Sequence, residues 1–161
     1  MDRLKNAWQE WHIKGFGPRY PHEKLIQFSL RNFQNRVLRQ DTKVLDVGCG
    51  AGADIVFFAQ EGFDVYGVDI SSGGLSHAKA RLDGFHLKAN LKLESADVLE
   101  FPKEYFDLIV CTGVYQYLPF DQINRSLSRI SKILKQVIKF LMLACRLVLT
   151  QHTEIILQKI L

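Results

Sequence analysis

The sequence has little cysteine, and its cysteines form no recognisable pattern. Cys49, Cys111 and Cys145 are scattered through 161 residues, with no C-x-x-C pair and no histidine at metal-binding spacing. Disulfide frameworks and zinc sites need such pairs, so the sequence predicts neither. We expect reduced thiols, no metal and a cytoplasmic protein.

The chain also lacks a long uncharged apolar run. Its most apolar stretch, residues 137–149, is shorter than the ~20 residues that span a bilayer, and it contains Lys139 and Arg146. The first residues are polar and carry both signs of charge, unlike a secretory signal. We therefore expect no membrane partner, and the length suits one domain.

Charge of one sign does not dominate the chain, whose net charge is +4. Both ends are basic, whereas residues 44–120 are acidic. A nucleic-acid-binding surface needs clustered Lys and Arg, and aromatic residues between them on which bases stack. Here the basic residues are spread along expected helices, which favours solvated helix faces and predicts no nucleic-acid partner.

What the sequence does contain is a regular alternation of short apolar strands and helical stretches. Strands are expected at 43–47, 64–68, 91–94 and 106–111, and helices at 21–38, 54–61, 74–82 and from Asp121 onwards. Such alternation predicts an α/β fold with a doubly wound, mostly parallel sheet and right-handed crossovers.

The first expected strand runs straight into a glycine loop, Gly48-Cys49-Gly50-Ala51-Gly52. Alternate glycines let backbone amides approach a ligand that a Cβ atom would keep away. A helix is expected to begin directly after the loop, so free amides at its N-terminus favour an anionic group. The pattern predicts a nucleotide-type binding turn.

The second expected strand ends in an acid, Asp69. Neighbouring parallel strands end side by side at the crevice of a doubly wound sheet, so we expect Asp69 beside the glycine loop. There its carboxylate is placed to accept both hydroxyls of a ribose. The alternative is a surface acid that merely closes a strand, and the spacing to the loop favours the ribose role.

Two cofactor classes fit the glycine pattern. Gly48, Gly50 and Ala53 satisfy the dinucleotide fingerprint, which would predict an NAD-binding oxidoreductase domain. Asp46, inside the strand before the loop, would repel a pyrophosphate and attract an ammonium group. A further strand-end acid, Asp97, also favours a cofactor other than NAD.

Four blocks occur in order at residues 46–52, 67–71, 96–98 and 106–118. Together they resemble class I S-adenosylmethionine-dependent methyltransferases over about residues 18–135. The resemblance implies a Rossmann-like sheet of order 3-2-1-4-5 and S-adenosylmethionine as cofactor. It also implies methyl transfer by direct displacement to a small-molecule acceptor that the sequence does not identify.

The resemblance further implies roles for individual residues. Asp46 would lie near the methionine amino group, and Asp69 would hold the ribose. Ile70, Asp97 and the Val98 amide would contact the adenine, while Thr112 and Gly113 would border the sulfonium. The implied cofactor site as a whole comprises Tyr20, Asp46, Gly48, Cys49, Gly50, Gly52, Asp69, Ile70, Ala96, Asp97, Val98, Thr112 and Gly113.

Residues 1–42 precede the expected core, residues 43–135, as a helical segment rich in aromatic residues. In this fold such an entry segment is often a lid over cofactor and substrate, and Tyr20 is the residue best placed to reach the cofactor. Alternatively, the tryptophans only attach a first helix to the domain. No catalytic residue is assigned, but Tyr115, Gln116 and Tyr117 are candidates for the acceptor pocket, unless Tyr117 packs beneath the next helix.

Residues 136–161 form a C-terminal tail that departs from the family pattern. No proline or glycine at 134–138 supplies the turn expected before a fifth strand. Residues 137–149 either supply that strand, or extend the preceding helix, or follow a disrupted reading frame near Lys135, which we favour. A sheet incomplete at this edge predicts self-association through the exposed strand.

Three functions of different classes follow. The four blocks favour an S-adenosylmethionine-dependent methyltransferase. The atypical tail suggests a cofactor-binding remnant or partner subunit without catalysis. An NAD-dependent oxidoreductase is disfavoured, because no catalytic domain follows the glycine loop and its sheet.

Overall fold

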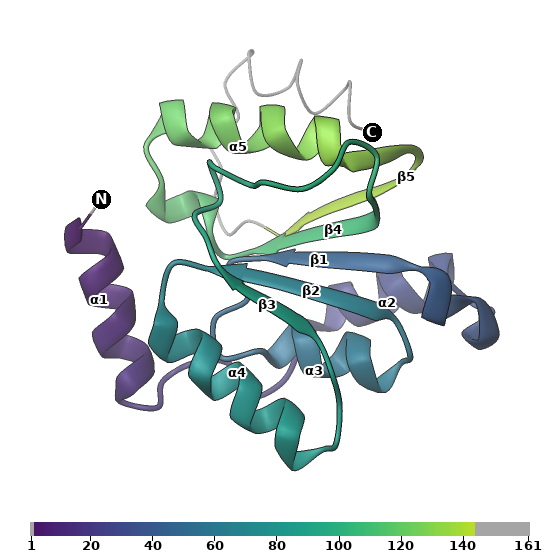
Figure 1. Cartoon of the computed structure of the whole chain (residues 1–161), viewed down its shortest axis with the longest axis horizontal. Coiled ribbons are helices and arrows are strands. Elements are labelled where there is room, and N and C mark those ends of the chain that lie inside the picture. Colours follow the sequence, from purple (N-terminus) through teal and green to yellow (C-terminus); the bar gives the residue numbers. More distant parts are fainter. Residues whose placement is uncertain (1, 144–161) are drawn as a thin grey trace.

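The computed structural model describes residues 2–143 (Figure 1). Its elements are α1 (Asp2–Ile13), α2 (Glu23–Asn32), the 3-10 helix η1 (Arg36–Asp41), β1 (Lys43–Val47), α3 (Ala53–Gln60), β2 (Asp64–Asp69), α4 (Ser72–Gly84), β3 (Asn90–Leu93), β4 (Phe106–Thr112), the 3-10 helix η2 (Tyr115–Tyr117), α5 (Phe120–Ile133) and β5 (Leu134–Leu143). Among these residues no helix is both long and apolar enough to cross a membrane.

The five strands form one parallel sheet in the order β3-β2-β1-β4-β5. β1 lies in the middle and pairs with β2 on one side, through Leu45↔Tyr66, and with β4 on the other, through Leu45↔Ile109. Because every pair is parallel, the carboxyl ends of all strands lie at the same edge of the sheet. The predicted fold class and strand order are confirmed.

Alternate residues of the central strands build two separate cores. On β4, Leu108 and Val110 join the cluster formed with α2, α3 and α4, whereas Ile109 and Cys111 join the cluster formed with α5. Figure 1 shows α5 on one side of the sheet and α2, α3 and α4 on the opposite side. Both faces are therefore covered, which explains why the central strands carry buried apolar residues on both of their faces.

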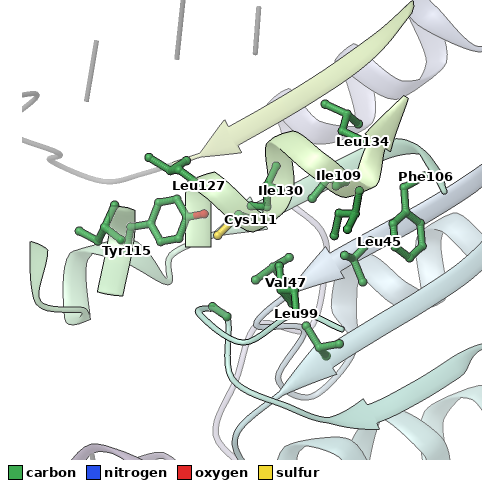
Figure 2. Close-up of a cluster of buried hydrophobic side chains, with 14 residues drawn as sticks. Leu45, Val47, Leu99, Phe106, Ile109, Cys111, Tyr115, Leu127, Ile130 and Leu134 are labelled. Atoms are coloured by element: carbon green, nitrogen blue, oxygen red, sulfur yellow. The ribbon is translucent and has the colours of Figure 1, made fainter. Parts of the chain in front are cut away.

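The core beneath α5 is drawn in Figure 2. Leu45 and Phe106 from the strands meet Leu127 and Ile130 from the helix, and all four are fully buried. Leu127 and Ile130 thus form a core-facing stripe along the helix. The helix begins at Phe120, one residue before the expected start at Asp121.

The single helix expected over residues 21–38 is wrong in its extent. α2 ends at Asn32, and the chain turns before the 3-10 helix η1. The side chain of Asn35 accepts a hydrogen bond from the Val37 amide and so caps η1. Asn side chains compete with helical backbone bonds in this way. Val37, in the part of the expected helix that belongs to η1, is 73% exposed.

The segment after residue 133 is the fifth strand. α5 passes directly into β5 at Leu134, without a proline–glycine turn. The end of the helix is held instead by the carbonyls of Lys132 and Ile133, which accept the amides of Glu104 and Tyr105 at 2.9 and 2.8 Å. The structure therefore has a fifth strand, and the boundary expected after residue 135 falls inside β5. The remainder of the expected tail, residues 144–161, lies outside the described residues.

Candidate functional site

Three strand ends bring most of the expected site residues together at the carboxyl edge of the sheet. The glycine loop follows β1, Asp69 ends β2 and Thr112 ends β4. The loop folds back towards β2, because the amides of Gly48 and Cys49 both donate to the carbonyl of Val68, at 2.8 and 3.0 Å. These strand ends form the crevice in which ligands of doubly wound folds bind.

Asp69 supports the shape of the glycine loop. One carboxylate oxygen accepts the Gly50 amide at 2.8 Å, and the other accepts the Ser71 amide at 2.7 Å. Gly50 has a φ of +49°, a left-handed conformation that glycine adopts without strain. Each carboxylate oxygen can accept a further hydrogen bond, so the predicted ribose contact is compatible with these two bonds.

Asp46 is a buried carboxylate without a partner among residues 2–143. Its side chain belongs to a residue that is 2% exposed, and no hydrogen bond or ion pair from the described part of the chain reaches it. Burial, followed by the charges of Asp54 and Asp69, raises the pKa of this carboxyl well above its usual range. Because an isolated buried charge is costly, the site calls for a cationic ligand group.

Asp54 adds a third acid to the crevice. It lies in the first turn of α3 and is 9% exposed. Burial raises its pKa, and the neighbouring Thr112 hydroxyl and His22 offset part of that rise. Within the described residues, no Lys or Arg forms an ion pair with Asp46, Asp54 or Asp69. The crevice therefore favours positive charge.

Helix α1 lies across this edge of the sheet (Figure 1). On the β2 side, the buried His12 places Nδ1 2.9 Å from the hydroxyl of Ser71, and that hydroxyl also lies 3.1 Å from Gln9 Oε1. On the β4 side, Trp8 makes an edge contact with Tyr117, with ring centroids 5.0 Å apart. α1 thus bridges the two sides of the crevice.

Comparison with known proteins assigns this arrangement to a family. A family model described as "Methyltransferase domain" matches residues 44–137, more than half of the chain. The chain belongs to this methyltransferase family. The resemblance seen in the four sequence blocks is confirmed, and with it S-adenosylmethionine as the cofactor of the domain.

Several methyltransferases are similar to this chain. The ubiquinone biosynthesis O-methyltransferase of Coxiella burnetii is 27% identical over 122 residues, which are 76% of this chain and 52% of that protein. The phosphoethanolamine N-methyltransferase of Plasmodium falciparum is 28% identical over 74% of this chain and 45% of that protein. The crystal structure of an S-adenosylmethionine-dependent methyltransferase from Methanosarcina mazei superposes with a TM-score of 0.58 at 28% identity, over 66% of this chain and 51% of that one. The methyltransferase chain described here spans about half the length of these relatives.

The crevice of this methyltransferase domain fits the groups that S-adenosylmethionine carries. Asp46 would offer an unpaired carboxylate to the ammonium group, and Asp69 would offer acceptor capacity to the ribose hydroxyls. At Gly113 a Cβ atom would meet no other atom within 4 Å, so there is open space beside the end of β4. The bound cofactor supplies a methyl group on a positively charged sulfur, and the nearby acids suit that charge.

Asp97 and Val98, both expected to contact the adenine, form hydrogen bonds within the protein. Arg125 Nη2 donates to Asp97 at 3.0 Å, and the Ser95 hydroxyl donates at 2.6 Å. Burial would raise the pKa of Asp97, but these bonds outweigh it and hold the pKa below its usual range. The Val98 amide donates to the Ser95 carbonyl at 3.0 Å. Both groups therefore have partners within the protein, and their adenine contacts stay a prediction.

Three other expected site residues are either buried in a core or largely exposed. Cys49 and Ala96 are buried, each in one of the two cores, so they can offer only backbone groups. Tyr20 is 72% exposed, with the Arg19 guanidinium over its ring. His12 occupies the place by the loop instead, since a Cβ atom at Gly50 would lie 3.1 Å from its Nε2.

His12 and Asp54 are site residues that the sequence interpretation missed. The sequence carried only a weak indication that Asp54 belongs to the site. An acid in the first turn of a helix is common, because it interacts favourably with the helix dipole. His12 carried none, since its partner Ser71 lies far along the chain. The two tyrosines after β4 also differ: Tyr115 is buried in the α5 core, whereas Tyr117 is 47% exposed and faces Trp8.

Two cavities lie on the described part of the chain. The smaller, of about 270 Å³, adjoins the glycine loop and is lined by Phe16, Ala51, His77 and Arg81 among others. The larger, of about 1260 Å³, lies at the opposite, amino end of β2 and β3 near Asp64. The larger cavity contains none of the acids of the crevice, so its size is no argument for placing the cofactor there.

Proposed function

We propose that this chain transfers the methyl group of S-adenosylmethionine to a small-molecule acceptor by direct displacement. The observation that carries the proposal is the unpaired, buried carboxylate of Asp46 beside the glycine loop, in a chain of the methyltransferase family. Direct displacement depends on aligning donor and acceptor, which a preformed crevice between rigid strands provides. The nicotinamide alternative receives no support from the matched family.

The acceptor would enter beside Gly113, under α1. Tyr117 and Trp8 border that side of the crevice, and Tyr117 is the exposed member of the pair considered for the acceptor pocket. The names of the relatives concern an oxygen acceptor in one case and a nitrogen acceptor in another. A test panel therefore includes phenols and catechols as well as phosphorylated amino alcohols.

Two measurements on the full chain test this function. Calorimetric titration with S-adenosylhomocysteine should show saturable binding, and titration with NAD should show none. Transfer of a radiolabelled methyl group to the acceptor panel should then identify a substrate. Absence of S-adenosylhomocysteine binding would overturn the proposal, whereas binding without transfer to any acceptor would favour a non-catalytic partner subunit.

For assembly, we propose a homo-oligomer that forms through β5. Within the described residues β5 pairs only with β4, so its other edge presents backbone groups for pairing with a second copy. Light scattering after size exclusion should give a mass above that of one chain. A monodisperse monomer across the concentration range would contradict this proposal without affecting the proposed chemistry.

A further inference from the structure

Asp54 is a buried acid to which the methyltransferase resemblance assigns no role. It lies on α3, Asp46 lies on β1 and Asp69 ends β2, so three carboxyl groups from three elements surround one glycine loop. None of the three residues is more than 9% exposed. Asp69 accepts two backbone amides, but no donor or cation from residues 2–143 reaches Asp46.

The charges of Asp46 and Asp54 act on one another across the crevice. The charge of Asp54 is the largest contribution after burial to the raised pKa of Asp46. When two carboxyl groups share a buried site without a cation, the pKa of one of them is strongly raised. In the free protein the pair is therefore expected to retain a proton at a pH where an exposed aspartate has lost it.

The surroundings of the pair supply no such cation. The titratable or hydroxyl-bearing side chains that face the acids from neighbouring elements are Cys49 on the glycine loop, Cys111 and Thr112 on β4, His22 before α2, His12 on α1 and His77 on α4. Burial raises the pKa of both thiols and lowers that of His12, so these three groups are neutral near pH 7. His22 only partly offsets the raised pKa of Asp54.

We propose that Asp54 is a cofactor-binding residue which, together with Asp46, receives the ammonium group of S-adenosylmethionine in exchange for a proton. The carboxyl proton of the pair leaves to solvent as the ammonium group enters, so one positive charge replaces another. No covalent bond of the cofactor changes in this step. The inference rests on the proposed function, because it requires that the cofactor binds in this crevice.

The exchange has a defined dependence on pH. Because the free protein holds a proton that the complex releases, affinity for a ligand with an ammonium group rises with pH. The rise approaches about tenfold per pH unit while the pair is protonated in the free protein, and it levels off above the raised pKa. A ligand without the ammonium group should lack this dependence.

Calorimetric titration of the full chain with S-adenosylhomocysteine in phosphate and in Tris, both at pH 7, measures the exchange. The two buffers differ in ionisation enthalpy, so the difference in observed heat counts the protons released; we expect a value approaching one. 5′-Methylthioadenosine keeps the adenosine and the sulfur but lacks the amino group, and it should release none. Equal release by both ligands would overturn the inference, since the proton would then come from the adenosine end.

Two variants sharpen the experiment. Asp54→Asn should reduce the proton release by at least half and flatten the pH dependence of affinity. Asp107→Asn is the matched control, because Asp107 is also buried, at 8% exposed, but lies at the amino end of β4. This variant should leave the proton release and the pH dependence of affinity unchanged. Full release by Asp54→Asn would overturn the role of this residue.

The failures are distinguishable. The comparison of buffers and ligands on the unaltered chain does not depend on how well Asp54→Asn folds. If S-adenosylhomocysteine does not bind at all, the proposed function fails and this inference with it. If it binds without proton release, only the inference about Asp54 and Asp46 fails.

Discussion

At the amino end of β4, Asp107 accepts hydrogen bonds from the Lys135 ammonium and the Lys43 amide, each at 2.8 Å. At the carboxyl end of the neighbouring β1, Asp46 is at least as buried, yet no partner among residues 2–143 reaches it. A paired buried acid holds elements of the fold together, whereas an unpaired one destabilises the free protein until a cation arrives. The comparison separates an acid whose partners lie within the fold from an acid that, in our proposal, receives its partner from the cofactor.

The largest expected effect comes from replacing one of two glycines, Gly50 before α3 or Gly62 after it. Gly50→Val should abolish S-adenosylhomocysteine binding, because valine resists positive φ and its Cβ would lie 3.1 Å from His12 Nε2. Gly62→Val is the matched control: its φ is +88°, but its Cβ would meet no atom within 4 Å. It should cost about 1–2 kcal/mol of stability and leave affinity intact. Thermal melting and calorimetric titration of both variants decide; normal affinity of Gly50→Val would show that the loop does not contact the cofactor.

The next test compares the two acids at the ends of β2. Asp69→Ala should weaken S-adenosylhomocysteine binding by about 2–3 kcal/mol, through loss of the ribose contact and of the bond that supports the Gly50 amide. Asp69→Asn should fall in between, since an amide still accepts but carries no charge. Asp64→Ala, which removes a partly exposed ion pair with Lys43 at the other end of the strand, should change affinity less than twofold. Retention of full affinity by Asp69→Ala would rule out the ribose role.

At the amino end of β4, a substitution is expected to change stability and leave cofactor affinity unchanged. Asp107→Ala should lower the free energy of unfolding by about 1–2 kcal/mol, because the Lys43 amide loses its acceptor and Lys135 its partner. S-adenosylhomocysteine affinity, measured well below the melting temperature, should stay the same. Chemical denaturation together with titration checks both halves, and a large loss of affinity would break the division between the two ends.

The smallest expected effect concerns the docking of α1. Burial lowers the pKa of His12 below 6.5, and the charge of Asp69 opposes this only in part. The undocked helix therefore binds the proton more readily, so docking is complete above pH 6.5 and weakens as the pH falls below that value. The loss grows with the difference between the two pKa values of His12, at about 1.4 kcal/mol for each pKa unit. Fluorescence of Trp8 and Trp11 should report it, and the same pH response in His12→Gln would assign it to another group.

Local patterns accounted for much of the fold and part of the site. The alternating strands, the glycine loop and the placement of Asp46 and Asp69 follow from short sequence distances, since a strand, its turn and the next strand end are neighbours along the chain. The sequence was less informative where contacts with residues far along the chain determine the structure. The adenine contact expected for Asp97 stays a prediction, but its bond with Arg125, one crossover further along the chain, was not foreseen. β5 was doubted because its turn lacks proline and glycine, whereas hydrogen bonds from Glu104 and Tyr105 hold that turn.

The sequence by itself determined the α/β class and a glycine loop flanked by two acids, because these depend on periodicity and on spacing within one crossover. The order of the strands followed from the resemblance to a known family. Only the tertiary structure decided which buried acids have partners. It placed Asp54 beside Asp46 and packed His12 of α1 against Gly50, while it gave Asp107 a lysine. Charge pairing and burial depend on distances through space between distant parts of the chain, and those distances exist only once the sheet has formed and its helices have packed.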